Sequence, residues 1–329
     1  MKRFLSVLLS LILILSVSSA CSKKAAEDTT EATTEAATEA TTEATTEATT
    51  EAGFTNPLTG LPCDEDYSGI RPYCSMVNNI EVATPQSGVS QADIFYEILA
   101  EGGITRNMAV FQDIYDVGVL GSTRSARPYF VDVADSYDSI YIHAGGSEGG
   151  YDEIAATGIQ DIDGVNGHDD IFYRDEWRMN NEGYEHSLMI DTSLIHDYES
   201  KYDLDVNHES GYKCNLVFTD DGTPKSGDTA NAIDVFFTYK DTSFEYSTSD
   251  QVYYAYEYDA PYSDAENGVQ LSFTNVIVLK TSVSTMADGE HLSIVTTGSG
   301  DGYFACGGKY AAITWSREDG GQFTYTYAD

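Results

Sequence analysis

The first 52 residues cannot contribute to a hydrophobic core, and this confines any globular structure to the rest of the chain. Residues 2–3 are basic, residues 4–17 form an apolar run too short for an ordinary membrane-spanning helix, and residues 18–20 have small side chains. Cys21 follows directly. This order is typical of a bacterial lipoprotein signal, so the sequence predicts a signal peptide over residues 1–20 and a lipid on Cys21.

Residues 21–52 are predicted to form a disordered tether. From residue 31 to residue 51 a glutamate stands at every fourth position, and threonine and alanine fill the gaps. On a helix these glutamates would form one like-charged stripe, and threonine is a poor helix former. The segment has no apolar face to bury, so we expect a solvated Thr/Glu/Ala spacer that lifts the folded part from a membrane.

The chain is strongly acidic, with a formal net charge of -37. Such a charge argues against nucleic acid and against an anionic bilayer as direct partners of the folded part. We therefore expect the membrane to be a partner only through the lipid on Cys21, at the outer face of the cytoplasmic membrane. A cell-wall precursor or another envelope protein is the candidate ligand. The sequence predicts no cofactor, because the glycine-rich segments match no cofactor-binding motif.

Four cysteines remain after Cys21, and outside the cytoplasm an even number permits two disulfides. The candidate pairs are Cys63 with Cys74 and Cys214 with Cys306. Four separate buried thiols are an equally weighted alternative. No pair has zinc-finger spacing, and the acidic residues 161–170 do not follow the EF-hand pattern, so no metal site is predicted.

The residues from Gly53 onward suffice for two domains of ordinary size. Residues 53–205 mix strand and helix patterns, which predicts an α/β or α+β domain made of a mixed sheet and helices. Residues 210–329 carry strand patterns separated by Gly/Asp clusters, which predicts a mostly antiparallel β domain. We expect strands at 73–77, 94–99, 104–112, 139–143, 235–239, 252–258, 271–279, 292–297 and 311–315, helices at 125–137, 151–156 and 187–202, and turns at 220–222 and 298–302.

Several segments carry a resemblance to a known family. They are residues 56–60 (NPLTG), 77–79 (VNN), 85–88 (PQSG), 101–106 (EGGITR), 122–130 (STRSARPYF), 141–147 (YIHAGGS), 275–278 (NVIV) and 313–315 (ITW). Through them the chain resembles the YerB-like lipoproteins, which are built on a domain of unknown function, the 3048 family. The resemblance implies a secreted lipoprotein with two linked domains, and it implies no established reaction.

The basic residues of the first half are an unusual set. All six between residues 53 and 200 are arginines, whose planar guanidinium groups suit bidentate binding of carboxylate or phosphate. Arg106, Arg124 and Arg127 lie within the segments that resemble the family. They predict an anion-binding site, and the alternative is internal pairing with acidic residues in the same half, which are Asp93, Glu97, Glu101 and Asp132.

A glycine-rich segment follows the strand predicted at 139–143. Backbone N–H groups at Gly145, Gly146 and Ser147 are candidates to cradle the same anion. Residues 145–149 also match the nucleophile-elbow pattern of serine hydrolases in form, although glycine-rich loops often match it by chance. His143, at the end of the predicted strand, is more often a structural residue than a catalyst.

The sequence thus leaves three functions open. The first is a lipid-anchored, non-catalytic binding or accessory protein of the cell envelope, with an arginine-lined anion site. The second is an envelope enzyme acting on a phosphate- or acyl-bearing wall precursor, with Glu97, Glu101 or His143 as the base. The third is a protein-interaction scaffold that uses the β domain.

Overall fold

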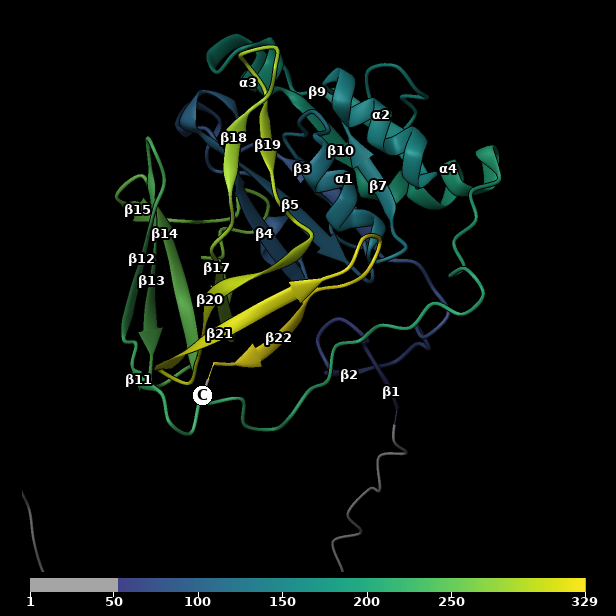
Figure 1. The fold of residues 1–329 in the computed structure, drawn as a ribbon. Helices are drawn as coiled ribbons and strands as arrows, with labels where there is room; N and C mark the ends of the chain where they lie inside the picture. Colours follow the sequence, from purple (N-terminus) through teal and green to yellow (C-terminus); the bar gives the residue numbers. More distant parts are fainter. Residues whose placement is uncertain (1–52, 329) are drawn as a thin grey trace, which may run out of the picture. The chain divides into compact units, whose positions relative to one another are not determined.

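A mixed five-stranded sheet lies at the centre of the first half of the chain (Figure 1). The computed structural model describes residues 53–328, so the predicted signal peptide, Cys21 and the predicted tether lie outside the described residues. β4, β5 and β3 are antiparallel neighbours, whereas β7 and β8 run parallel to β3. The strand order is β4 (Ile94–Leu99), β5 (Thr105–Phe111), β3 (Tyr73–Val77), β7 (Ile140–His143) and β8 (Asp161–Asp163).

Helix α1 (Pro128–Asp135) covers one face of this sheet. Pro128 begins the helix, where the missing backbone N–H costs nothing because that group has no partner within a helix anyway. Phe130 packs with Met76 and Met108 of the sheet in one hydrophobic cluster. The sequence predicted a helix over 125–137, and α1 confirms its central part.

The opposite face is covered by a smaller antiparallel sheet and by helix α4 (Ile195–Tyr202). This sheet has the order β6 (Val119–Gly121), β10 (Leu188–Asp191) and β9 (Phe172–Arg174). The helix predicted over 187–202 is therefore wrong in its first part. The run Leu188, Met189, Ile190 is buried on both sides as a strand, and the helix begins only at Ile195.

The first half has further elements, most of them short. They are α2 (Glu148–Thr157), α3 (Glu176–Asn181), β1 (Phe54–Thr55), β2 (Pro62–Cys63), and the 3-10 helices η1 (Glu81–Ala83), η2 (Val89–Gln91), η3 (Glu101–Gly103), η4 (Tyr184–His186) and η5 (Thr192–Leu194). Between residues 53 and 328, no helix has both the length and the apolar character needed to cross a membrane.

The second half consists of antiparallel sheets, which confirms the predicted fold class. One sheet has the order β11 (Asp228–Thr229), β21 (Lys309–Arg317), β20 (Gly298–Cys306) and β17 (Asn275–Leu279), and β22 (Thr324–Tyr327) also pairs with β21. A second has the order β12 (Ala232–Phe236), β13 (Asp241–Ser247), β14 (Val252–Glu257) and β15 (Ala260–Pro261), and β16 (Ser272–Phe273) also pairs with β14. β18 (Val283–Thr285) and β19 (Leu292–Ile294) form a separate hairpin.

Strand β20 occupies a place that the sequence assigned to a turn. Its first residues, 298–302, contain three glycines, which led to the wrong expectation. A Cβ on Gly300 would stand only 2.6 Å from Nε1 of the buried Trp315 on β21, so this position accommodates the indole because it has no side chain. Gly300 therefore leaves space for the Trp315 side chain, and it does not end the strand.

The two halves share core residues. Ala255, Tyr262 and Leu271 of the second half belong to the same hydrophobic cluster as Tyr73 and Phe111 of the central sheet. The boundary predicted near residues 205–210 falls within residues 203–227, which contain no helix or strand of regular length, and the division into two domains stays a prediction.

Candidate functional site

The three candidate arginines gather near the start of α1. Arg127 holds the N-cap position of this helix, and Arg124 precedes it by three residues. Arg106 lies on β5 and, two residues from Met108, faces the same side of the sheet as α1. Glu101 lies in η3, between β4 and β5. We call Arg106, Arg124, Arg127 and Glu101 the arginine site.

Glu101 is shared by two buried guanidinium groups. Arg127 donates to it in a bidentate manner, with Nε 2.6 Å from Oε1 and Nη2 2.9 Å from Oε2. Nη2 of Arg106 lies 3.4 Å from Oε2. Burial opposes ionisation of Glu101, but the hydrogen bonds from Arg127 and the charges of both arginines outweigh it and lower the pKa of the carboxyl. The pairing predicted as the alternative to ligand binding therefore exists at Glu101.

Around Glu101, positive charge nevertheless exceeds negative charge. Arg106 and Arg127 are only 5% and 7% exposed, and one carboxylate faces both. Nη1 of Arg106 donates to the carbonyl of Ser125 at 3.1 Å, whereas its buried Nε has no hydrogen-bond partner in the described part of the chain. Burial and the charge of Arg127 lower the pKa of Arg106 to about 10. Two guanidinium groups thus share one carboxylate, and the remaining positive charge would favour a further anion.

Arg124 is the most exposed arginine of the site, with 18% of its side chain exposed. Its Nη1 donates to the backbone carbonyl of Glu185 at 2.9 Å and lies 3.6 Å from the Glu185 carboxylate. Burial lowers the pKa of Arg124; Glu185 opposes this effect, and Arg127 adds to it. The outer end of the site is therefore faced by Glu185, whose side chain is 68% exposed.

His186 lies beside Glu185 and is buried. Its Nδ1 is 2.9 Å from the amide nitrogen Nδ2 of Asn78, which can only donate, so Nδ1 accepts and the proton resides on Nε2. Nε2 lies 3.4 Å from Oε1 of Glu185. Burial, and then the charge of Arg124, lower the pKa of His186, so its ring is a neutral N–H donor near neutral pH. Sequence reasoning missed Asn78 and Glu185, because only the folded chain brings Asn78 to His186 and Glu185 to Arg124.

The glycine-rich segment lies next to the arginine site, but the N–H groups of Gly145 and Ser147 are bonded within the chain, to Asp163 and to the carbonyl of Ala126. Gly145 N–H donates to Asp163 at 2.7 Å, and Ala126 N–H donates to the carbonyl of Gly145 at 2.8 Å. Ser147 caps α2, where its Oγ accepts from the N–H of Gly150 at 3.1 Å. Gly146 forms a bridge with Ala126. These contacts fix the loop beside Arg127 and give Ser147 a capping role.

The candidate bases are enclosed by partners. His143 has no exposed surface, and its nitrogens face the carbonyl of Gly145 at 2.8 Å and Asp161 at 3.0 Å. Glu97 faces four donors, which are Asn79, Thr105, Thr242 and Lys240. Glu101 is held by arginines, as described above. The structure therefore brings Glu101 to the arginines and leaves Glu97 and His143 in separate networks.

The four cysteines of the described chain are free, and neither candidate disulfide forms. Cys74 is fully buried in the cluster beneath α1, whereas Cys63 lies on the peripheral strand β2. Cys214 donates to the carbonyl of Pro57 at 3.4 Å. Within residues 53–328, no group of three or more His, Cys, Asp or Glu side chains could hold a metal ion.

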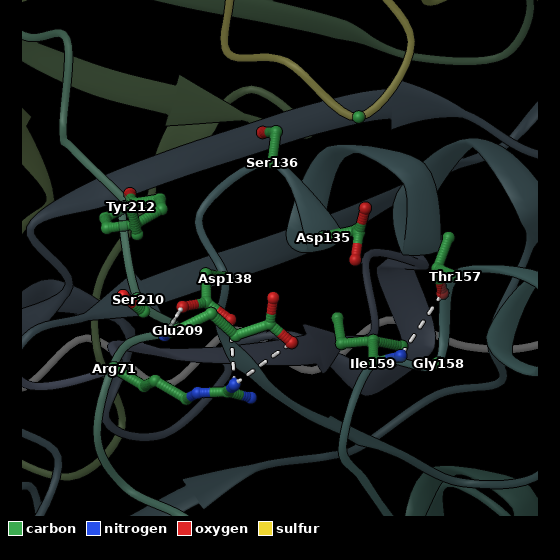
Figure 2. A pocket seen from close by; sticks show the side chains of 11 residues that line it. Arg71, Asp135, Ser136, Asp138, Thr157, Gly158, Ile159, Glu209, Ser210 and Tyr212 are labelled. Carbon is green, nitrogen blue, oxygen red and sulfur yellow. Dashed lines mark hydrogen bonds and ion pairs between the residues drawn. The ribbon is translucent and has the colours of Figure 1, made fainter.

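A separate pocket of about 320 Å³ lies at the ends of α1 and α2 (Figure 2). Arg71 pairs there with Asp138 at 3.0 Å and lies 3.8 Å from Glu209, while Asp135 stands apart from this pair. Burial, and then the charge of Asp132, raise the pKa of Asp135 to about 6. The sequence did not indicate this pocket, because its acidic residues are scattered over 75 positions of the chain, from 135 to 209.

Comparisons with known proteins agree with this fold. The family model described as the N-terminal domain of a protein of unknown function (DUF3048) matches residues 58–204, and the model of its C-terminal domain matches residues 233–329. A Bacillus subtilis (strain 168) protein named "Putative lipoprotein YerB" is 42% identical over 118 residues, which are 36% of this chain and 35% of that protein. The matched segment thus spans about a third of that relative. The crystal structure of YerB protein from Bacillus subtilis has a TM-score of 0.72 and 25% sequence identity, and covers 83% of this chain and 90% of that one.

Proposed function

This chain belongs to the DUF3048 family, and we propose that it is a lipid-anchored, non-catalytic binding protein of the cell envelope. The anchor is a lipid on Cys21, and the contact point for ligands is the arginine site. The leader sequence that ends at Cys21 supports the anchor, as does the name of the related Bacillus subtilis protein. The ligand is an anion such as a phosphate or carboxylate of an envelope precursor.

One observation carries the proposal of an anion site. In a chain of net charge -37, three arginines gather near the well-bonded carboxylate of Glu101 and the weakly held one of Glu185, and the guanidinium of Arg106 keeps a buried donor without a partner. Buried donors in native proteins nearly always have partners, so the unused Nε needs an explanation. An anion that reaches the site past Arg124 would reduce the excess of positive charge.

The binding role is favoured over catalysis by the state of the candidate bases. Glu97 and Glu101 already accept several charged or polar donors, and His143 is enclosed. A general base must reach the proton that it removes, and these groups reach only their partners within the chain. Ser147 serves as a helix cap and has no histidine among its hydrogen-bond partners.

Titration calorimetry of the full chain in a neutral detergent, with inorganic phosphate and diphosphate as probes, tests the proposal. We expect both anions to bind, and Arg124→Gln to weaken binding at least about tenfold, because a charge-assisted hydrogen bond contributes about 1.5–3 kcal/mol. Arg124→Lys keeps the charge and loses the planar fork, so its binding should be intermediate. Lys225→Gln, which removes an exposed positive charge elsewhere, is the matched control and should bind as the unmodified chain does.

Two results would overturn this function. If neither anion binds, or if Arg124→Gln binds as tightly as the control, the arginines serve only to hold the fold, and the scaffold function is favoured. The anchor is tested separately, by feeding cells radiolabelled palmitate. Cys21→Ser should abolish labelling, and labelling that survives this substitution would exclude Cys21 as the acceptor.

A further inference from the structure

Resting on this proposed function, we infer that the Glu185 carboxylate occupies the place of the ligand's anionic group, and that the ligand is an anionic sugar whose ring stacks on Tyr184. The ligand class is then a sugar phosphate or a similar acidic saccharide. Three consecutive residues of η4, Tyr184 to His186, form this site together with Arg124 and Arg174.

The Glu185 carboxylate is only weakly held, as a group that a ligand displaces would be. It lies 3.6 Å from Nη1 of Arg124 and 3.4 Å from Nε2 of His186, and both distances are too long for good hydrogen bonds. Its side chain is 68% exposed, so it can leave without exposing apolar surface. An exposed ion pair of this kind contributes at most about 1 kcal/mol, and a ligand can displace it.

The donors behind Glu185 are more firmly placed than the carboxylate itself. Nη1 of Arg124 is fixed by the backbone carbonyl of Glu185 at 2.9 Å, and the His186 ring is fixed by Asn78 at 2.9 Å. Because Asn78 donates to Nδ1, the N–H of Nε2 points to the same carboxylate as Arg124. A phosphate has three oxygens and a larger charge than a carboxylate, so it can engage both donors at shorter distances.

Tyr184, the residue before Glu185 on η4, provides an exposed ring. The Arg174 guanidinium stacks 3.9 Å from the centre of the ring, and its Nη1 donates to the Tyr184 carbonyl at 2.7 Å. This contact holds one face of the ring, while the residue is 64% exposed. Among the described residues, no other aromatic ring stacks on Tyr184. The second face can therefore receive a ring from solvent.

A sugar fits this second face better than a planar or fully apolar group. The C–H face of a pyranose is weakly positive and complements the negative face of an aromatic ring, while its hydroxyls stay in water. Because Tyr184 and Glu185 are neighbours on η4, with Cα atoms about 3.8 Å apart, a sugar phosphate whose ring stacks on the first is long enough to place its phosphate at the second. The positive donors then select saccharides that carry an anion.

Calorimetry of the full chain in neutral detergent, with N-acetylglucosamine 1-phosphate as the probe, tests the inference. Glu185→Gln removes the internal competitor, and we expect the affinity to rise about fivefold, which is the effect that release of one exposed ion pair can have. Glu245→Gln, at an exposed glutamate on β13, changes the net charge equally and should leave the affinity unchanged. Glu185→Ala, which also removes the side chain's length, should reproduce the gain.

The ring is tested by Tyr184→Ala with the matched control Tyr327→Ala, which removes a tyrosine that is 48% exposed on β22. Tyr184→Ala should weaken binding of the sugar phosphate about tenfold and leave binding of inorganic phosphate unchanged. Circular dichroism and the melting temperature of each variant show whether it is folded.

The outcomes separate this inference from the proposed function. If phosphate binds and requires Arg124, but Glu185→Gln gives no gain, the anion site stands and the role of Glu185 is refuted. If Tyr184→Ala weakens phosphate and sugar phosphate equally, or neither, the ligand is not recognised through a sugar ring. If phosphate does not bind at all, both the proposed function and this inference fail.

Discussion

Replacing Glu257 with glutamine should make the free energy of unfolding less dependent on pH. Glu257 lies at the end of β14 and is buried, and it pairs with the buried Lys240, which also contacts Glu97 at 2.9 Å. One ammonium thus faces two carboxylates. Asn79 and two hydroxyl groups also donate to Glu97. Burial raises the pKa of Glu257 to about 7, Lys240 opposes the rise, and Glu97 adds to it.

The size of this pH effect follows from the difference between the pKa of Glu257 in the folded chain and its pKa in the unfolded chain. The ordinary pKa of a glutamate is 4.5 and that of Glu257 in the folded chain is about 7. The folded state therefore binds this proton more tightly, and the resulting stability is complete below pH 4.5 and is lost as pH rises to 7. A difference of this size corresponds to about 3 kcal/mol, since one pKa unit is about 1.4 kcal/mol.

Chemical denaturation at about pH 5 and about pH 8 measures this effect. The free energy of unfolding of the unmodified chain should fall by about 2–3 kcal/mol from the lower to the higher pH because Glu257 ionises. Glu257→Gln should not show this fall, because glutamine cannot ionise. Glu245→Gln, on the adjacent strand β13, is exposed and should show the same fall as the unmodified chain. A difference between Glu257→Gln and the unmodified chain that is the same at both pH values would refute the reasoning.

Three further predictions concern the core and its edges. Gly300→Ala should destabilise the chain by about 1–3 kcal/mol in denaturant titrations, because the new Cβ would meet the buried indole of Trp315. In the control Gly69→Ala the new Cβ meets no atom within 4 Å, so the stability should hardly change. In the unmodified chain the buried guanidinium of Arg317 donates to both carboxylate oxygens of Asp132, at 2.6 and 3.0 Å. Asp132→Asn removes this charge partner and should lower the free energy of unfolding by about 3–5 kcal/mol; a loss below 1 kcal/mol would contradict this. Burial raises the pKa of the Cys74 thiol to about 12, so it should resist thiol reagents in the native chain and react only after unfolding, and rapid native labelling would show the burial to be incorrect.

Strands surrounded by other elements on both faces were the most predictable part of the fold. The limits of β3 and β4 coincide with the predicted 73–77 and 94–99, because each is a short run composed mainly of apolar and aromatic residues, and Asn78 ends the first while Asp93 precedes the second. The fold class and the family are also confirmed. The errors at 187–194 and at 298–302 have a common cause, since there tertiary packing determined the structure: Ile190 is buried between layers, and Gly300 admits a large ring.

For the candidate site, the sequence predicted which types of residue take part but not which residues they contact. The absence of lysine in residues 53–200 indicated that the arginines have a special environment, and the structure gathers Arg106, Arg124 and Arg127 near the start of α1. The partner of each depends on side-chain positions that no local pattern records. Glu185 approaches Arg124 from 61 positions away. The role of this cluster as a ligand site stays a prediction.

The core that the two halves share has a consequence for folding during synthesis. The ribosome releases the chain from its N-terminus, yet the layer over Tyr73 and Phe111 is completed by Tyr262 and Leu271. Asn107, in the middle of β5, likewise finds its partner hydroxyl only on Tyr262. Until these late residues emerge, the central sheet presents an open apolar side, and such distant pairing is slow to form. The nascent polypeptide must therefore be shielded from aggregation over most of its synthesis.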